Sequence, residues 1–115
     1  MTGTIARAGK VNDLTNDAAA LDQAWTELLD VVACLRQEAA DKALHNASAF
    51  LSALGHVVVG WLWLDQALAA AAAMREIRLR SCRYFVSTEL PKARQQLTFV
   101  KSLNDEAVQF ADALF

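Results

Sequence analysis

The run of residues 50–64, FLSALGHVVVGWLWL, most constrains what this chain can fold into. It is apolar on every side of a helix, although His56 interrupts it and Asp65 ends it. A surface helix needs only one apolar stripe, whereas a helix that is apolar all round must be covered all round. A chain of 115 residues can build only one core of modest size. We therefore expect this helix at the centre of the fold, with part of its cover supplied by another subunit or domain.

Composition and spacing predict an all-α protein. One proline and four glycines leave few places to turn, and the abundant alanine and leucine favour helices. Apolar residues recur every three or four positions over residues 14–39, which indicates an amphipathic helix. Further helices are expected over 42–74, 78–90, 92–101 and 105–114, with a reversal near 75–77 and a kink at Pro91. The predicted fold is an antiparallel helical bundle of three to four helices around a long central apolar helix.

The domain boundaries follow from the same pattern. Residues 1–12 are polar and contain two glycines, so we expect a disordered or extended lead-in. Residues 13–115 then form a single helical-bundle domain. The lead-in lacks the apolar stretch of a signal peptide, and this favours a cytoplasmic protein. The two cysteines lie far apart and match no metal spacing, so both are expected to be reduced and buried.

Charge and length exclude two classes of partner. The formal net charge is -2, with acids and bases interspersed, whereas a nucleic-acid-binding domain carries a basic face. A membrane-spanning helix needs about 20 apolar residues, and Asp65 ends the apolar run before that length is reached. We therefore predict neither nucleic-acid binding nor a membrane span.

No pattern in the chain points to catalysis or to a metal. His45 and His56 are three helical turns apart, about 16 Å, so they cannot share one ion. Asp41 and His45 could meet on one helix face but lack a third ligand. No glycine-rich phosphate loop and no nucleophile motif is present. For His56 two readings stay open: a core histidine bonded to a backbone carbonyl or polar partner, and a residue that contacts a ligand.

Glycines and aromatic residues in the apolar run suggest how it is used. Gly55 and Gly60 each cost about 1 kcal/mol relative to alanine in a helix, so we expect another helix to approach closely at both. An alternative is an apolar pocket for an acyl chain, lined by Phe50, His56, Trp61 and Trp63. The two tryptophans are two residues apart and point in different directions, so at most one faces a given pocket. Asp65 is expected to pair with a basic residue of the next helix, namely Arg75, Arg78 or Arg80.

Two sequence blocks carry a resemblance. The first reads HNASAFL at residues 45–51 and LGHVVVGWLW at 54–63, and the second reads RLRSCRYF at 78–85 before Leu90-Pro91. Together they resemble the C-terminal helical domain of a branch of the acyl-CoA dehydrogenases, with the pattern N-A-x-x-Y-L-x-x-x-G-H-V-x-x-G-W, then K-x-x-x-A-R-F-Y and L-P. Phe50 stands for the tyrosine, Arg78 for the lysine and Cys82 for the alanine, while Arg83 keeps the arginine.

The resemblance implies a role without chemistry of its own. In that family a glutamate base and FAD oxidise the acyl-CoA, and both belong to domains outside this module. No residue here matches that glutamate, so the resemblance implies a non-catalytic assembly module, with FAD in the parent or partner oxidoreductase and no catalytic, cofactor or metal residues in this chain. The expected partner is a second copy or a flavoenzyme body. The candidate interface or pocket residues are Phe50, Gly55, His56, Gly60, Trp61, Trp63 and Arg83.

Overall fold

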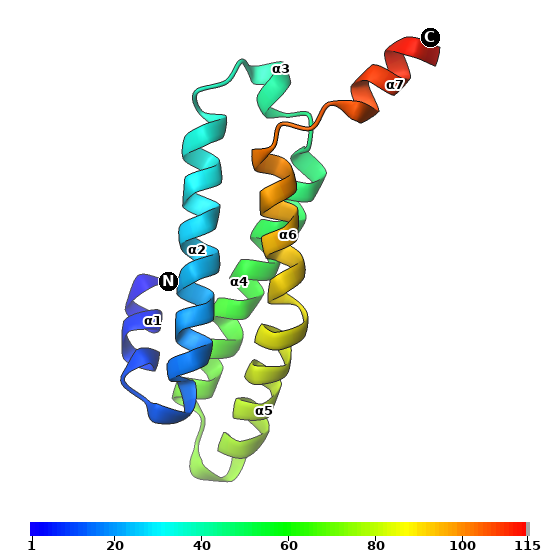
Figure 1. Ribbon diagram of the computed structural model, residues 1–115. Coiled ribbons are helices and arrows are strands. Elements are labelled where there is room, and N and C mark those ends of the chain that lie inside the picture. Colours follow the sequence, from blue (N-terminus) through cyan, green and yellow to red (C-terminus); the bar gives the residue numbers. More distant parts are fainter. Residues whose placement is uncertain (115) are drawn as a thin grey trace.

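The computed structural model describes residues 1–114, which form helices throughout and no strand (Figure 1). The elements in chain order are α1 (Thr2–Gly9), the 3-10 helix η1 (Asn12–Leu14), α2 (Thr15–Leu35), α3 (Ala40–Ala43), α4 (Ala47–Ala69), α5 (Ala72–Thr88), α6 (Leu90–Lys101) and α7 (Glu106–Leu114). The predicted all-α class is confirmed, and α4 is the long apolar helix that the sequence indicates.

Three columns of helix make up the bundle. α2 and α4 are two of them, and α5 continues into α6 to form the third, so that α4 runs antiparallel to both of the other columns, which are parallel to each other (Figure 1). α4 packs against α1, α2, α5 and α6, which places it at the centre. Leucines and valines from every column fill the core, the largest fully buried ones being Leu14, Leu21, Val31, Val57, Leu64, Leu90, Leu97 and Val100.

The predicted disordered or extended lead-in is wrong for residues 2–9, because these residues are helical. They form α1, which packs against α2 and α4. Thr4 and Ala8 lie one turn apart and are both buried, because their small side chains let α1 approach its neighbours closely. Such a short helix is marginal alone, so tertiary contacts with α2 and α4 stabilise it.

The predicted helix over 42–74 is also wrong in its length. It is interrupted between α3 and α4, and it ends at Ala69. Ala70 and Ala71 have extended backbone and make the reversal, five residues before the expected one. Alanines give no local signal that ends a helix. The position of the reversal is therefore set by packing, since Ala67 is the last residue of α4 that is buried in the core. Pro91 restarts the third column as predicted, since it lies in the first turn of α6, where no amide hydrogen is needed.

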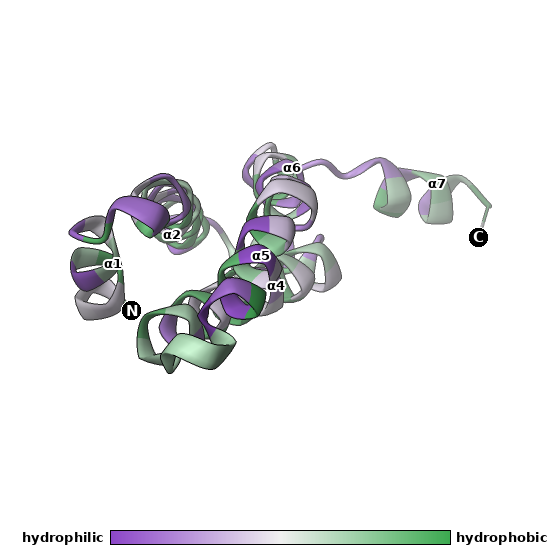
Figure 2. Ribbon diagram, turned by 90° about the horizontal axis from the view of Figure 1, so that it is seen from below, coloured by the Kyte–Doolittle hydropathy of each residue, from purple (hydrophilic) through white to green (hydrophobic). Residues whose placement is uncertain are grey.

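α7 stands apart from the bundle. It projects beyond the end of α6, so the structure is 60 Å long but only 25 by 16 Å across (Figures 1 and 2). Its first turn is capped by Asn104, whose Oδ1 accepts a hydrogen bond from the Glu106 amide at 3.2 Å. A helix over 105–114 is thus present as predicted, but without tertiary cover.

By length and composition alone, α4 is the one helix within residues 1–114 that could cross a membrane, and 22% of its most apolar 18-residue stretch is buried. A central bundle helix has the same length and composition, and α4 contacts four other helices. The absence of a membrane span stays a prediction. What needs explanation is the large part of α4 that the bundle leaves uncovered.

Candidate functional site

The outer face of α4 carries an uncovered apolar row, Leu51, Gly55, Val59 and Leu62, which we call the α4 stripe. Its three larger side chains are 64%, 41% and 46% exposed, in chain order. The four positions follow one another at three- and four-residue steps and therefore share one helix face. Residues 47–64 contain no acidic or basic side chain apart from His56, so the stripe itself carries no charged side chain, and the nearest ones are His56 at the hollow and its partner Glu89. Isolated exposed apolar residues are ordinary, whereas a continuous row of them marks a contact surface.

Gly55 leaves a hollow in this stripe. A Cβ built at Gly55 would meet no atom of residues 1–114 within 4 Å, so the close helix approach predicted there does not occur among these residues. The hollow has a volume of about 340 Å³ and is bordered by Leu51, His56, Val59 and Phe85. At Gly60 the opposite holds, because an added Cβ would lie 3.3 Å from Leu21 Cδ1 and 3.3 Å from Phe85 Cε1. Gly60 therefore permits the packing of α2 and α5 on α4, whereas no neighbour among residues 1–114 requires Gly55.

His56 has the contacts of a structural histidine. Its Nδ1–H donates to the Ser52 carbonyl oxygen at 2.8 Å, because a carbonyl can only accept. Its Nε2 lies 3.7 Å from Glu89 Oε2, and its ring stacks on Phe85 with centroids 6.4 Å apart. Glu89 sits between α5 and α6 and also accepts from Lys92 Nζ. His56 thus ties α4 to the break in the third column, in agreement with the reading as a partnered core histidine.

The four residues of the predicted acyl-chain pocket do not meet. Trp61 turns toward α1, where its Nε1–H donates to Thr4 Oγ1 at 2.9 Å. Trp63 borders a hollow of about 440 Å³ beside Tyr84 and Phe85 of α5. His56 borders the hollow at Gly55, and Phe50 lines a third depression at the other end of α4. Phe50, His56 and Trp63 therefore border different hollows, which adjoin one another at Leu51 and Phe85.

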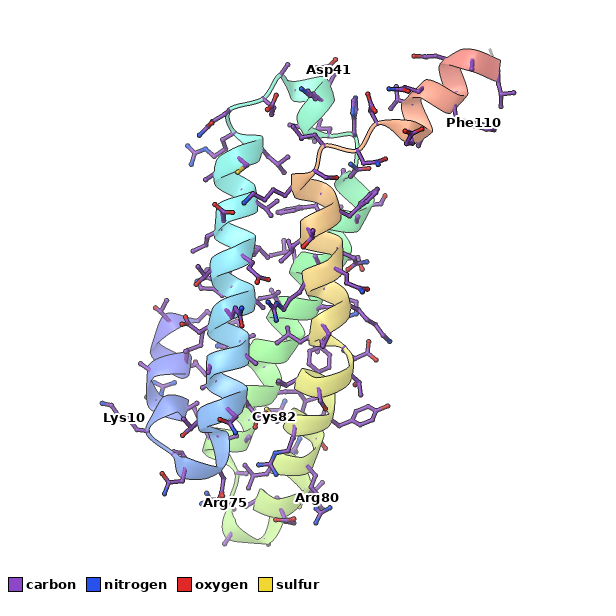
Figure 3. All side chains as sticks on the ribbon, viewed as in Figure 1. Lys10, Asp41, Arg75, Arg80, Cys82 and Phe110 are labelled. Carbon is purple, nitrogen blue, oxygen red and sulfur yellow. The ribbon has the colours of Figure 1, made fainter. Side chains whose placement is uncertain are left out.

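Arg83 links the start of α2 to α5. Its Nη2 donates to the Asp13 carbonyl oxygen at 2.9 Å, and its Nε lies 3.9 Å from Oδ2 of the buried Asp17. Burial raises the pKa of Asp17 above its usual value, and the Arg83 charge partly opposes this rise. Burial, with the Asp17 charge as a second cause, raises the pKa of Cys82 to about 12. Cys82 lies inside the bundle, whereas Arg75 and Arg80 lie on its outside (Figure 3), so Cys82 stays a protonated thiol.

Substituting Asp17→Asn is expected to raise the free energy of unfolding at pH 7 by about 1 kcal/mol. The folded protein holds the Asp17 proton more tightly than the unfolded chain does. The Asp17 contribution to stability is therefore fully present below the ordinary pKa and is lost as the pH rises through the raised value. Urea unfolding at pH 7 and at pH 3.5 checks this, with the gain expected to shrink at the lower pH. A loss of stability at pH 7 would mean that the ion pair with Arg83 outweighs the cost of burial.

Asp65 does not pair with the residues expected of it. Its carboxylate faces Arg7 of α1 at 3.6 Å. Arg75 pairs with Asp13, Arg78 donates to Gln66, and Arg80 pairs with Glu76 within its own helix. The prediction was wrong because α1, which the sequence did not indicate as a helix, occupies the side of α4 that Asp65 faces.

The sequence reading also missed an apolar depression at the start of α4, which we call the α2–α4 groove. It has a volume of about 460 Å³, and its apolar lining includes Val32 and Leu35 of α2, Leu44 after α3, and Phe50 and Leu51 of α4. Only Phe50 was a candidate residue. Leu44 was the residue from which the sequence could have indicated the groove, since it is a large apolar side chain beside a helix break. Whether Leu44 is exposed, however, depends on where α3 ends.

Within residues 1–114 no three His, Cys, Asp or Glu side chains come together as a metal site. The α2–α4 groove and the hollows at Gly55 and Trp63 also do not suit FAD. The α2–α4 groove offers Arg36 as its one charged group, and the hollows at Gly55 and Trp63 are bordered largely by apolar side chains. A dinucleotide cofactor needs backbone amides or several polar groups around its pyrophosphate. These three surfaces therefore offer apolar contact area and few polar groups.

Comparison with protein-family models gives one match. The model of the family described as "Acetyl-CoA dehydrogenase C-terminal like" matches residues 1–111, which is nearly the whole chain. No curated protein and no solved structure matches the chain.

Proposed function

Because the chain belongs to the acetyl-CoA dehydrogenase C-terminal-like family, we propose that it is a non-catalytic assembly module of an FAD-dependent acyl-CoA dehydrogenase-like enzyme. The module associates with a second copy of itself through the α4 stripe. Acyl-CoA oxidation takes place on the flavin-bearing part of the enzyme or on a partner chain. A cytoplasmic location is part of the same proposal.

The observation that carries the proposal is the uncovered face of the central helix. Leu51, Val59 and Leu62 leave apolar surface in water, and covering a large apolar side chain contributes about 1.5–3 kcal/mol when burial is complete. Gly55 adds to this, since a helical glycine costs about 1 kcal/mol and nothing within residues 1–114 uses its space. A second helix crossing at Gly55 accounts for both features.

A second copy suits this face well. The α4 stripe holds both projecting side chains and the hollow at Gly55, so one stripe can fill the other about a two-fold axis. Because the stripe itself carries no charged side chain, two copies of it meet without like charges. The acyl-chain alternative has weaker support, because the residues expected to line its pocket border different hollows or, for Trp61, turn toward α1.

Replacing Val59 and Leu62 with lysine is expected to abolish the self-association that runs through the α4 stripe. Lysine is a good helix former, and both side chains point to solvent, so the thermal midpoint at low protein concentration should change little. In the associated form the new charges would be buried without partners. Sedimentation velocity from about 1 to 100 µM measures the change, together with circular dichroism.

The matched control places the same two charges, at the same spacing, on exposed positions of α6. The double substitution Gln95→Lys and Thr98→Lys is expected to keep the wild-type association. A well-folded wild-type chain that stays strictly monomeric over this range would overturn self-association. If such a monomer bound a separately prepared flavoenzyme body and V59K/L62K abolished that binding, the stripe would be a docking surface for the body instead.

A further inference from the structure

α7 displays apolar side chains that nothing in the described chain covers. Phe110 is 67% exposed, Val108 and Leu114 are exposed as well, and so is every other residue of α7. On the helix, Ala107, Phe110, Ala111 and Leu114 fall on one side, whereas Gln109 and Asp112 fall on the other. An isolated helix of nine residues is marginal in water. An amphipathic helix this short needs a surface to pack on.

The α2–α4 groove is an apolar surface at the same end of the bundle. Val32, Leu35, Leu44 and Phe50 line it, and its volume of about 460 Å³ accommodates several large side chains. The charges around it are mixed, because Arg36 lines the groove while the adjoining residues hold Glu38, Asp41 and Lys42, with Lys42 paired to Glu38 at 3.6 Å. Residues 105–114 hold Asp105, Glu106 and Asp112 and no base, so Arg36 is the charge in the groove wall that attracts them.

The link between α6 and α7 directs α7 away from its own groove. Leu103 has a φ of 55°, in the left-handed region, which turns the chain sharply after α6. The Asn104 carbonyl oxygen then accepts a hydrogen bond from Asn46 Nδ2 at 3.0 Å, beside the start of α4. Both views of the ribbon show α7 leaving the bundle from this point (Figures 1 and 2), and the labelled Phe110 lies well outside it (Figure 3).

We propose that α7 of each protomer packs into the α2–α4 groove of a second copy, so that two chains exchange their C-terminal helices. The exchange is reciprocal, because the donor helix and the acceptor groove lie at the same end of each bundle and one two-fold axis satisfies both. The acidic residues of α7 then face Arg36 in the groove of the other chain. The groove shares Leu51 with the α4 stripe, but Val59 and Leu62 take no part in the exchange, so substitutions at those two positions separate the two contacts.

Disulfide trapping between two differently tagged chains tests the exchange. One chain carries Leu44→Cys and the other Phe110→Cys, both in a Cys34→Ser background that removes the partly exposed native thiol, while buried Cys82 stays. Mild oxidation of the mixture is expected to give a cross-linked heterodimer as the main product. The matched control replaces Phe110→Cys with Gln109→Cys, which lies on the polar side of α7, and should reduce the heterodimer several-fold.

Two further measurements make the outcome decisive. A single chain carrying both L44C and F110C should also cross-link between molecules. If it closes within one molecule, α7 covers its own groove and the exchange is overturned. In the V59K/L62K background, which lacks the contact through the α4 stripe, Phe110→Asp is expected to weaken the remaining dimerisation at least 10-fold without loss of the thermal midpoint, whereas Gln109→Ala should not. Equal dimerisation with and without F110D in that background would overturn the exchange. Trapping that persists in V59K/L62K separates this contact from the α4 stripe.

Discussion

Replacing Leu64 with alanine is expected to lower the free energy of unfolding by about 3 kcal/mol. Leu64 is 1% exposed and belongs to the core that joins α4 to its neighbours. The substitution removes buried methyl groups and leaves a cavity that rigid neighbouring helices fill only in part. Urea unfolding at micromolar protein, followed by circular dichroism, gives the value.

Leu62→Ala is the matched control for this experiment. Leu62 lies two residues away on the same helix but points outward, so its truncation should cost less than about 1 kcal/mol in the monomer. The same substitution should weaken association through the α4 stripe. Equal losses of stability for L64A and L62A would contradict the assignment of the two sides of α4 to core and interface.

Gly60→Leu is expected to destabilise the fold by about 3 kcal/mol, since it overpacks a tight contact. An added Cβ alone would lie 3.3 Å from both Leu21 and Phe85, and the rest of a leucine side chain has no room between α2 and α5. Those helices would have to move apart. Differential scanning calorimetry should show a lower midpoint, with the helix content at low temperature retained.

Gly55→Ala tests whether Gly55 and Gly60, which the sequence does not distinguish, have different roles in the structure. A methyl group at Gly55 meets no atom of residues 1–114 within 4 Å, so the monomer should gain up to about 1 kcal/mol from better helix propensity. Association through the α4 stripe should weaken, because the methyl group fills part of the hollow. A destabilised monomer would show that another element of the chain covers Gly55.

The periodicity of apolar residues and the composition were sufficient to predict the fold class. Apolar residues at three- and four-residue steps predict α2 from about residue 14, and Pro91 predicts the restart at α6, because both signals act through local backbone geometry. The motif blocks also gave the family, which the match over residues 1–111 shows. The ends of α4 were not predictable in this way, since Ala69–Ala73 can continue a helix or leave one.

The candidate site was only partly predictable. An all-round apolar helix indicates that cover is missing, but the sequence does not say on which side. Gly55 and Gly60 have the same intrinsic propensity, and only the positions of Leu21 and Phe85 distinguish them. α1 was missed for a similar reason: Thr4 and Ala8 are small residues whose burial depends on α2 and α4 being in place. That error also led to the wrong partner for Asp65.

By itself the sequence determined that this chain is helical, that residues 50–64 form its central helix, and that this helix needs more cover than the chain supplies. These follow from propensity and from the 3.6-residue period, which are local properties. Only the tertiary structure decided that Leu51, Gly55, Val59 and Leu62 are the uncovered side of α4, and that α7 stands free beside an apolar groove. Burial depends on which surfaces of distant segments meet, and that is a property of the whole packed chain.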